Sequence, residues 1–469
     1  MAHAWLICQN AYFITTEVEK MSLLKAKAVD ATTGTLWKKI IAYTIPLIIG
    51  SLVQNCFNAV DLIVLGNMAD SSAVASIGAT SSITSLLVNS FIGIASGSQL
   101  ILAKMFGARD WDGTRKTVNT SLITALFLGL LILVIGLPLA SSFLIWTNCP
   151  ENCLDGAALY LRIYIMAAPA ILLYNFGSSI LRAAGDSQRP LYYIIISGLV
   201  NIVLNIVLCL VLTQKVAAVA IATAVSQLLG AVLVLRRLAV MEGPGRLILS
   251  GLKFDFRSFR FIMAQGLPMA LTNALYPFAN LQIQSAINSY GVSAIAGNSA
   301  AASLEGIFNS IPGGFTSTAS VFIGQNMGAR QNDRAREAMK QCLLIGCGIG
   351  VVMGISVYLS ADFWLSLYLP DDPMGIEYGK IRMLYVQLFI SVSCAKGVYG
   401  SALQNCGYVP FTTLCSILGV FGFRMLWMWC VYPLFSNFHM LMSCFLISWT
   451  LVLIAHVIGY YKLCSRQLR

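Results

Sequence analysis

The sequence predicts an all-α polytopic membrane protein with twelve transmembrane helices in two pseudo-symmetric lobes of six. Hydrophobic residues make up 58% of the 469 residues and charged residues only 10%, with a mean hydropathy of +0.77. Soluble proteins are about a quarter charged, so this composition excludes an ordinary soluble globule. Apolar runs of about 20 residues, the length that crosses a bilayer as a helix, recur along the chain. The second half also repeats motifs of the first, which indicates a duplicated half-molecule.

The twelve expected helices follow these apolar runs in order. They span 39–66, 73–102, 117–140, 157–181, 191–213, 216–237, 262–289, 294–323, 339–360, 380–403, 411–434 and 438–461. A helix-breaking Gly-Pro-Gly run followed by a basic cluster separates the two sets of six. The expected domains are a cytoplasmic N-terminal tail (1–37), a first lobe (38–237), a cytoplasmic linker (238–261), a second lobe (262–462) and a cytoplasmic C-terminal tail (463–469).

Positive charge is concentrated on one side of the expected membrane. Lysine and arginine cluster in every second inter-helix segment and near both ends, whereas the alternate segments carry acids. This positive-inside pattern predicts a multi-pass protein of the cell membrane with both termini in the cytoplasm. The net charge of +11 then reflects topology and contact with the anionic lipid bilayer, and no nucleic-acid partner is expected. We expect a monomer. Residues 1–20 do not resemble a cleaved signal peptide, and Met21 is an alternative start.

A loop motif occurs once in each half, about 221 residues apart. Gly-Ala-Arg-x-x-Asp-x-x-Arg follows one long apolar run and precedes the next in both copies. We expect each glycine to end a helix in a left-handed conformation, each arginine to lie at that helix end, and each aspartate to cap the next helix. A structural role is favoured, and the alternative is a cytoplasmic latch between states. The motif residues are Gly107, Arg109, Asp112, Gly328, Arg330 and Asp333.

Asp61 is the membrane-embedded residue that most strongly indicates function. It lies late in the first expected helix, with apolar neighbours on both sides. A carboxylate within a bilayer span is energetically costly, so by default it marks an ion or substrate path. A buried carboxylic acid can also bind a proton near physiological pH. The alternative is an outer-boundary residue in contact with water, because Asn67 and Asp70 follow closely.

Several stretches together resemble the MATE family, the multidrug and toxic compound extrusion transporters of the MOP flippase superfamily. They cover about residues 38–462 and comprise Ile45-Pro46, 58–66, both loop motifs, 181–186, 201–205 and 219–223. The resemblance implies two six-helix lobes with alternating access between them. It also implies secondary active efflux of organic cations or other small amphiphiles by antiport with H⁺ or Na⁺, without a cofactor. The alternative is a lipid-linked oligosaccharide flippase of the same superfamily.

The resemblance maps a cation-coupling site onto Asp61, Asn201, Asn205 and Thr223. The two asparagines are one helical turn apart, and their amide oxygens, with the Thr223 hydroxyl, suit a hard cation. In isolation, two asparagines on a membrane helix are equally suited to interhelical hydrogen bonds. Many family members carry an aspartate at the position of Asn205. The missing carboxylate weakens a Na⁺ site, whereas Asp61 alone suffices for a proton cycle, so H⁺ coupling is preferred.

The second lobe departs further from the family. Acids that some members carry map onto Tyr276 and Ser393, and the lobe instead has Glu305, Lys396 and Arg424 within expected helices. Two cations and one anion in lipid should pair and face the lobe interior. We expect either a structural ion-pair network or a site where Glu305 binds a proton or a cationic substrate. A large, basic central cavity would favour the flippase alternative.

Four further residues have weaker implications. Arg162 and Arg382 lie near the outer ends of their helices and are expected to snorkel to the interface. Cys149 and Cys153 in an expected outer loop form a disulfide or remain two free thiols. The three histidines are widely separated in the sequence, so no metal site is expected.

No enzyme motif is evident. The chain has no P-loop ending in Lys-Ser or Lys-Thr, so ATP hydrolysis is not expected to drive it. Asp371-Asp372 offers one acidic pair to a membrane-embedded transferase, a remote alternative, but no second pair follows. These two residues are better explained as an outer turn beside prolines.

Overall fold

A computed structural model of the chain describes residues 28–68, 71–147, 149–243, 245–248, 251–465 and 467. Of residues 58–65, 67, 68, 71, 72, 74 and 152 it describes the backbone alone. The described chain consists of helices joined by short connections and contains no strand, which confirms the all-α fold class.

The first lobe is built from the first half of the chain. Its helices are α2 (Leu36–Met68), α3 (Ser71–Ala108), α4 (Trp111–Trp146), α5 (Glu151–Met166), α6 (Ala168–Ala183), α7 (Gln188–Val211) and α8 (Lys215–Val240). α5 and α6 form one bent span with an angle of 47° between them. The bend immediately precedes Pro169, which has no N–H to continue the hydrogen bonds of α5.

The second lobe is built from the second half. Its α-helices are α9 (Phe256–Asn288), α10 (Val292–Phe308), α11 (Ser310–Gly328), α12 (Asn332–Leu359), α13 (Ala361–Ser366), α14 (Pro373–Tyr385), α15 (Ile390–Asn405), α16 (Val409–Ser416), α17 (Phe423–Leu426) and α18 (Phe438–Gly459). Wider π-helical turns form η2 (Ile417–Gly422), η3 (Trp427–Val431) and η5 (Tyr460–Cys464), and a 3-10 turn forms η4 (Tyr432–Leu434). α10 and α11 again form a broken pair, with Pro312 in the first turn after the break.

Ten of the twelve expected spans correspond to helices that are long and apolar enough to cross a membrane. Nine helical stretches of the described chain are long and apolar enough to cross a membrane, and the α5–α6 pair makes a tenth. The other two expected spans, 262–289 and 294–323, are α9 and the α10–α11 pair. These helices lie in the bundle but are more polar, because several of their side chains line a cavity between the lobes.

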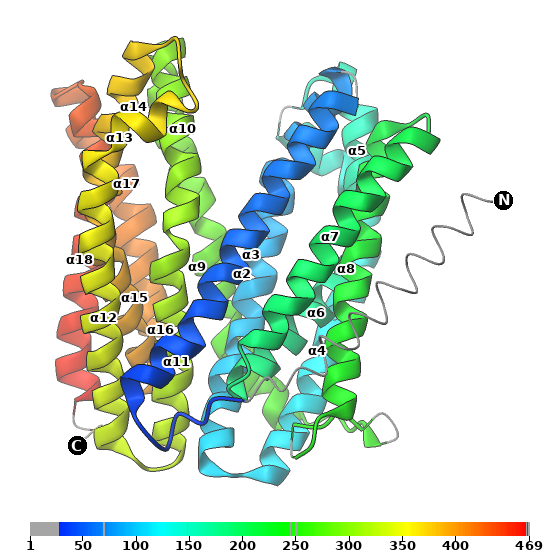
Figure 1. Cartoon of the computed structure of the whole chain (residues 1–469), viewed down its shortest axis with the longest axis vertical. Helices are drawn as coiled ribbons and strands as arrows, with labels where there is room; N and C mark the ends of the chain where they lie inside the picture. The colour runs from blue at the N-terminus through cyan, green and yellow to red at the C-terminus, as the bar shows by residue number, and fades with distance from the viewer. Residues whose placement is uncertain are drawn as a thin grey trace.

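The two lobes contact each other at one end and diverge toward the other (Figure 1). The contacting end carries the basic loops that follow α3 and α11. One buried cluster spans both lobes there, and within it the rings of Tyr43 (α2) and Phe322 (α11) pack edge to face, 5.5 Å apart. The hydroxyls of Thr44 (α2) and Thr318 (α11) share a buried 2.7 Å hydrogen bond. The cleft between the lobes is therefore closed at the end with the basic loops.

Residues 28–35, which the sequence assigns to a tail, connect both lobes; we call this segment the strap. The Val29 N–H donates to the Gly185 carbonyl of the first lobe at 2.9 Å. Ala31 is fully buried, and its N–H donates to the Gln325 side-chain oxygen of the second lobe at 3.1 Å. The Arg334 guanidinium donates to three carbonyls of the strap. The strap thus holds the lobes together in this state.

The cysteines of the expected outer loop are not bonded to each other. Cys149 and Cys153 are free thiols. A disulfide instead joins Cys406, just after α15, to Cys464, at the end of η5, with Cα atoms 6.0 Å apart. The bond attaches the C-terminal turn to the end of α15. The two cysteines are 58 residues apart in the sequence, and no local motif there predicts that they pair.

Candidate functional site

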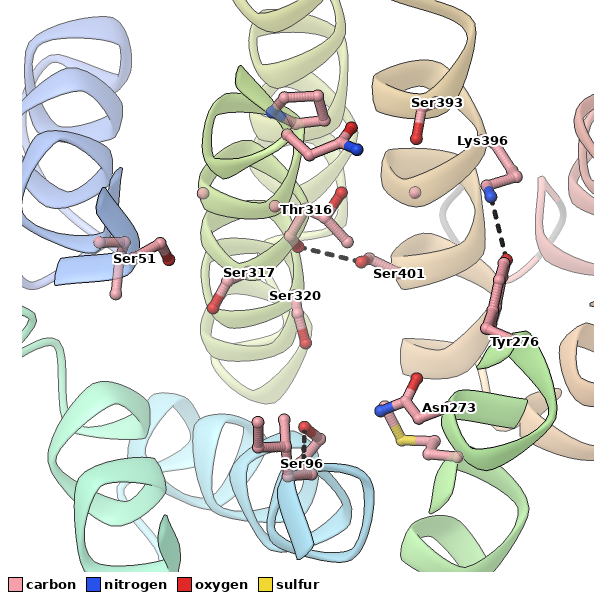
Figure 2. A pocket seen from close by; sticks show the side chains of 18 of the residues that line it. Ser51, Ser96, Asn273, Tyr276, Thr316, Ser317, Ser320, Ser393, Lys396 and Ser401 are labelled. Carbon is pink, nitrogen blue, oxygen red and sulfur yellow. Dashed lines mark hydrogen bonds between the residues drawn. The ribbon is translucent and has the colours of Figure 1, made fainter. Parts of the chain in front are cut away.

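A cavity of about 710 Å³ lies between the lobes. Residues of α2, α3 and α6 line it from the first lobe, and residues of α9, α10, α11, α15, α17 and α18 from the second. Hydroxyl side chains form much of the wall. Figure 2 shows Ser51 of α2 and Ser96 of α3 near Ser317 and Ser320 of α11, around one open space. The cavity thus offers many weak, adaptable hydrogen-bond partners.

The wall between α11 and α15 is closely packed. Ser401 of α15 donates to the Thr316 carbonyl of α11 at 3.0 Å (Figure 2). A Cβ at Gly397 would collide with the Thr316 side chain, so only glycine allows α15 to approach α11 this closely. This contact fixes the helix that carries Lys396.

Lys396 is a partly exposed cation of the cavity wall. Its ammonium donates to the Tyr276 hydroxyl of α9 at 3.1 Å, as Figure 2 shows. The same nitrogen lies 5.4 Å from the centre of the Tyr276 ring and 5.6 Å from that of Trp449. Aromatic faces attract a cation, so the two rings hold the Lys396 ammonium at this place in the wall.

Arg424 lies deeper and is only 1% exposed. It sits in α17, a single turn between the π-helical turns η2 and η3, and such wide turns are frequent at functional sites. Its guanidinium donates to Asn280 Oδ1 at 2.8 Å and to Ser448 Oγ at 3.2 Å, and lies 4.3 Å from the centre of the Phe445 ring. All of these partners are uncharged.

Glu305 pairs with a different cation from those expected. Arg382 of α14 donates to Glu305 Oε2 at 2.6 Å and to Asn298 Oδ1 at 2.7 Å. Arg382 is 8% exposed, so the expectation that it snorkels to the interface was wrong, whereas Arg162 is exposed. Glu305 thus forms its ion pair with Arg382 and not with Lys396 or Arg424, although the Arg382 and Arg424 guanidiniums lie 5.0 Å and 4.3 Å from the centre of the same Phe445 ring.

Replacing Glu305 by glutamine is expected to lower the free energy of unfolding by about 3 kcal/mol, because Arg382 is left as a buried charge without its counterion. The side chains of this pair are only 10% and 17% exposed. The matched control is Asp362→Asn, which removes the acid from the Lys380–Asp362 pair, whose side chains are 40% and 71% exposed. That loss should stay within about 1 kcal/mol. Denaturant unfolding in detergent measures both, and equal losses would contradict the assignment.

The mapped residues of the first lobe form a second polar cluster. Asn205 donates to Asn201 Oδ1 at 3.2 Å, Asn201 donates to Ser226 Oγ at 3.4 Å, and Ser226 donates to the Thr223 carbonyl at 2.8 Å. Both asparagines are buried. The chain of hydrogen bonds connects α7 to α8. None of Asn201, Asn205 and Thr223 lines the central cavity, so the two groups of candidates occupy different places.

Asp61 lies in α2, and its side chain is outside the described residues. The Phe57 ring occupies the space left by the absent side chain of Gly198 on α7. Gly50, nearly two turns earlier, lies against the beginning of α7, so the two helices run side by side in the same direction. One turn beyond Phe57, position 61 is level with the turn of α7 that carries Asn201. The backbone therefore brings together the helix positions that the resemblance implies.

The glycines of the loop motif differ from expectation. Gly107 and Gly328 are helical, and the left-handed residues are Arg109 (φ 55°) and Arg330 (φ 58°). A Cβ at Gly107 would collide with the backbone of Gln325 on α11, and a Cβ at Gly328 with the backbone of α3. The two repeat-related glycines thus let the ends of α3 and α11 cross in contact; we call this crossing the lobe junction.

The aspartates of the motif do not cap helices, so that expectation was also wrong. Asp110 caps α4 instead, because its carboxylate accepts from a backbone N–H three residues later at 3.0 Å. Asp112 lies in the first turn of α4 and pairs with Lys116 at 2.6 Å. Asp333 lies in the first turn of α12, 3.8 Å from Arg336. Both acids are still placed where a helix N-terminus favours negative charge.

Sequence reasoning missed most of the cavity wall. Asn273 and Asn280 of α9, and Phe445 of α18, line the cavity but were not singled out. The available signal was the low hydropathy of α9 and α10–α11 compared with the other spans. Within the described part of the chain, no cluster of three or more His, Cys, Asp or Glu side chains is placed to hold a metal ion.

Comparison with known proteins agrees with this architecture. The MatE family model matches the chain twice, at residues 46–207 and 268–429. A "Probable multidrug resistance protein YoeA" of Bacillus subtilis is 24% identical and covers 82% of this chain and 85% of its own length. A "FAD transporter" of Shewanella oneidensis is 23% identical and covers 76% and 78%.

The fold also matches solved structures. A crystal structure of MATE in complex with MaL6 superposes with a TM-score of 0.85 at 20% identity, covering 94% of this chain and 98% of that one. The likeness supports twelve helices in two lobes. The double match of one family model independently confirms the internal repeat.

Proposed function

The chain belongs to the MatE family of membrane transporters, and we propose that it exports small amphiphilic molecules by antiport with H⁺ or Na⁺. The observation that carries the proposal is the cavity of about 710 Å³ between two lobes that contact each other at one end only. Its size suits one drug-sized molecule. The relative named as a multidrug resistance protein supports the same assignment.

Alternating access requires that the lobe junction open while the opposite end closes. In the described state the strap, the Tyr43–Phe322 contact and the two glycines of the lobe junction seal the end with the basic loops. If that end faces the cytoplasm, as the positive-inside pattern predicts, this state accepts and releases ligand on the outer side. The strap and the lobe junction are the contacts that must break before substrate enters from inside.

We assign ion coupling to Asp61 with Asn201, Asn205 and Thr223. An ion drives the cycle only if it binds the two states with different affinity. The cluster lies where α2 packs on α7, and α2 also contributes Thr44 to the contact with α11. In this proposal, protonation or cation binding at position 61 alters the packing of α2, a helix that belongs to the lobe contact. Proton coupling remains preferred, because Asn205 supplies no second carboxylate.

Of the two alternative functions, the flippase is supported by the cavity wall and the transferase is not. The basic side chains in the cavity wall favour a flippase of the same superfamily as the second candidate. The transferase alternative gains no support: Asp372 caps α14 by accepting from the Gly375 N–H at 2.8 Å, which is a structural role.

Liposome transport tests the proposal directly. Purified protein is reconstituted, and a pH gradient and a Na⁺ gradient are imposed separately. We expect one gradient to drive accumulation of a fluorescent amphiphile above the level of protein-free liposomes, and that gradient identifies the ion. Folded, inserted protein that moves neither cationic nor anionic amphiphiles under either gradient would overturn the antiport.

A further inference from the structure

We infer that the cavity binds an anionic group, a carboxylate or phosphate on an amphiphilic molecule, rather than an organic cation. The inference deepens the proposed function by naming its substrate class. It starts from the charges on the wall: among the residues whose side chains the structure describes, Arg182, Lys396 and Arg424 line the cavity, and Glu305 is the one acid beside them. Cations outnumber acids, so the cavity has a positive potential toward a ligand.

Glu305 is not available to a cationic ligand. Its Oε2 accepts from Arg382 at 2.6 Å, and its Oε1 accepts from Asn309 at 3.3 Å. The Arg382 guanidinium neutralises its charge and is itself buried. A cationic substrate would therefore meet Lys396 and Arg424 without a free carboxylate to compensate them.

Lys396 has the geometry of an anion receptor. An ammonium has three N–H donors, and one of them points to the Tyr276 hydroxyl. Among the described residues, no carboxylate lies within ion-pair distance of Lys396. The remaining donors can reach a ligand because the residue is partly exposed to the cavity.

Arg424 supplies a second, deeper charge. It is bonded only to neutral partners among the described residues, Asn280 and Ser448. A buried guanidinium without a counterion is energetically costly in a bilayer. An anionic group in the cavity would provide the missing counter-charge, so ligand binding relieves this cost.

The rest of the wall suits the body of such a ligand. Phe445 and Trp449 add apolar side chains to the wall, and their rings lie against Arg424 and Lys396, respectively. Figure 2 shows the hydroxyls of Ser317, Ser320 and Ser393 around the space, where they can donate to anion oxygens. An amphiphile with one anionic end fits these features together.

A matched pair of probes tests the inference by binding. The probes are 1-pyrenebutyrate and a pyrenebutyl-trimethylammonium salt, which share the apolar body and differ in charge; fluorescence titration of the full-length protein in detergent gives Kd. Wild type should bind the anionic probe more tightly. Lys396→Met should weaken that binding about tenfold, as expected for a lost charge-assisted hydrogen bond, and leave the cationic probe unaffected.

Two further variants sharpen the result. Lys396→Glu should reverse the preference toward the cationic probe. Lys380→Met, which removes a lysine outside the cavity lining, should change neither Kd. Thermal unfolding checks that both Lys396 variants are folded. The inference is overturned if wild type prefers the cationic probe. It is also overturned if folded Lys396→Met and Lys396→Glu bind the anionic probe as tightly as wild type does.

Transport assays separate this inference from the proposed function and distinguish the sources of the anion. Anion-selective binding without ion-driven transport supports the inference and overturns the antiport. Ion-driven transport of the cationic probe alone supports the antiport and overturns the inference. Gradient-driven movement of 1-pyrenebutyrate identifies a soluble ligand, whereas transbilayer movement of a fluorescent phosphatidic acid identifies a lipid headgroup; each supports the shared chemistry.

Discussion

Replacing Asp61 by asparagine is expected to reduce ion-driven transport to the level of protein-free liposomes. Asparagine has nearly the same shape but can neither gain nor lose a proton and carries no charge for Na⁺. The inward-open and outward-open states would then no longer differ in their affinity for the ion. An ion gradient could therefore no longer drive the conformational cycle. Gradient-driven uptake into liposomes measures the effect.

A conservative change elsewhere controls for nonspecific damage. Asp362→Asn makes the same chemical change at an exposed residue of α13. That variant should transport like wild type. Asp61→Asn should bind substrate with unchanged Kd, because Asn201, Asn205 and Thr223, with which we assign Asp61 to act, do not line the cavity. Normal gradient-driven transport by Asp61→Asn would refute the proposed coupling site.

Replacing Gly107 or Gly328 by alanine is expected to prevent the lobes from closing at the end with the basic loops. The new Cβ would collide with the backbone of the other lobe, which cannot move aside without separating α3 from α11. Alanine otherwise stabilises a helix by about 1 kcal/mol relative to glycine, so any loss reflects the lobe junction. Transport should fall to background, and amide hydrogen exchange in 322–328 should accelerate.

Gly348 provides the matched control. It is an exposed helical residue of α12 with nothing within 4 Å of a Cβ built on it. Gly348→Ala should leave transport and exchange unchanged. If the junction variants behaved like Gly348→Ala, the lobes would not need this close contact, and the proposed closure would be wrong.

The sequence was sufficient for the architecture because the membrane imposes simple rules on it. Spanning helices must be apolar over about 20 residues, so hydropathy located most of them. The duplicated loop motif located the two halves. The same rules were weakest at α9 and α10–α11, where the chain faces a cavity and hydroxyl and amide side chains replace apolar ones.

The contacts within the site were less predictable. We expected Arg382 near a helix end because the apolar run begins at about residue 380. In the structure α14 begins at Pro373, so Arg382 lies more than one turn after the start of the helix and is buried. The roles of Gly107 and Gly328 depend on a crossing between segments more than 200 residues apart, which a local turn preference cannot reveal. Asp61 and Asn201 were brought together by the resemblance, not by local pattern.

The most direct test of the account is to reverse the coupling. The protein is reconstituted in liposomes that enclose indicators for H⁺ and Na⁺. No ion gradient is imposed. The pyrene probe that the protein binds is added outside the liposomes, so only the probe has an inward gradient. If transport is an exchange, probe entry must drive outward movement of one ion in wild type and not in Asp61→Asn. Probe entry without movement of either ion would show a passive carrier and contradict the account.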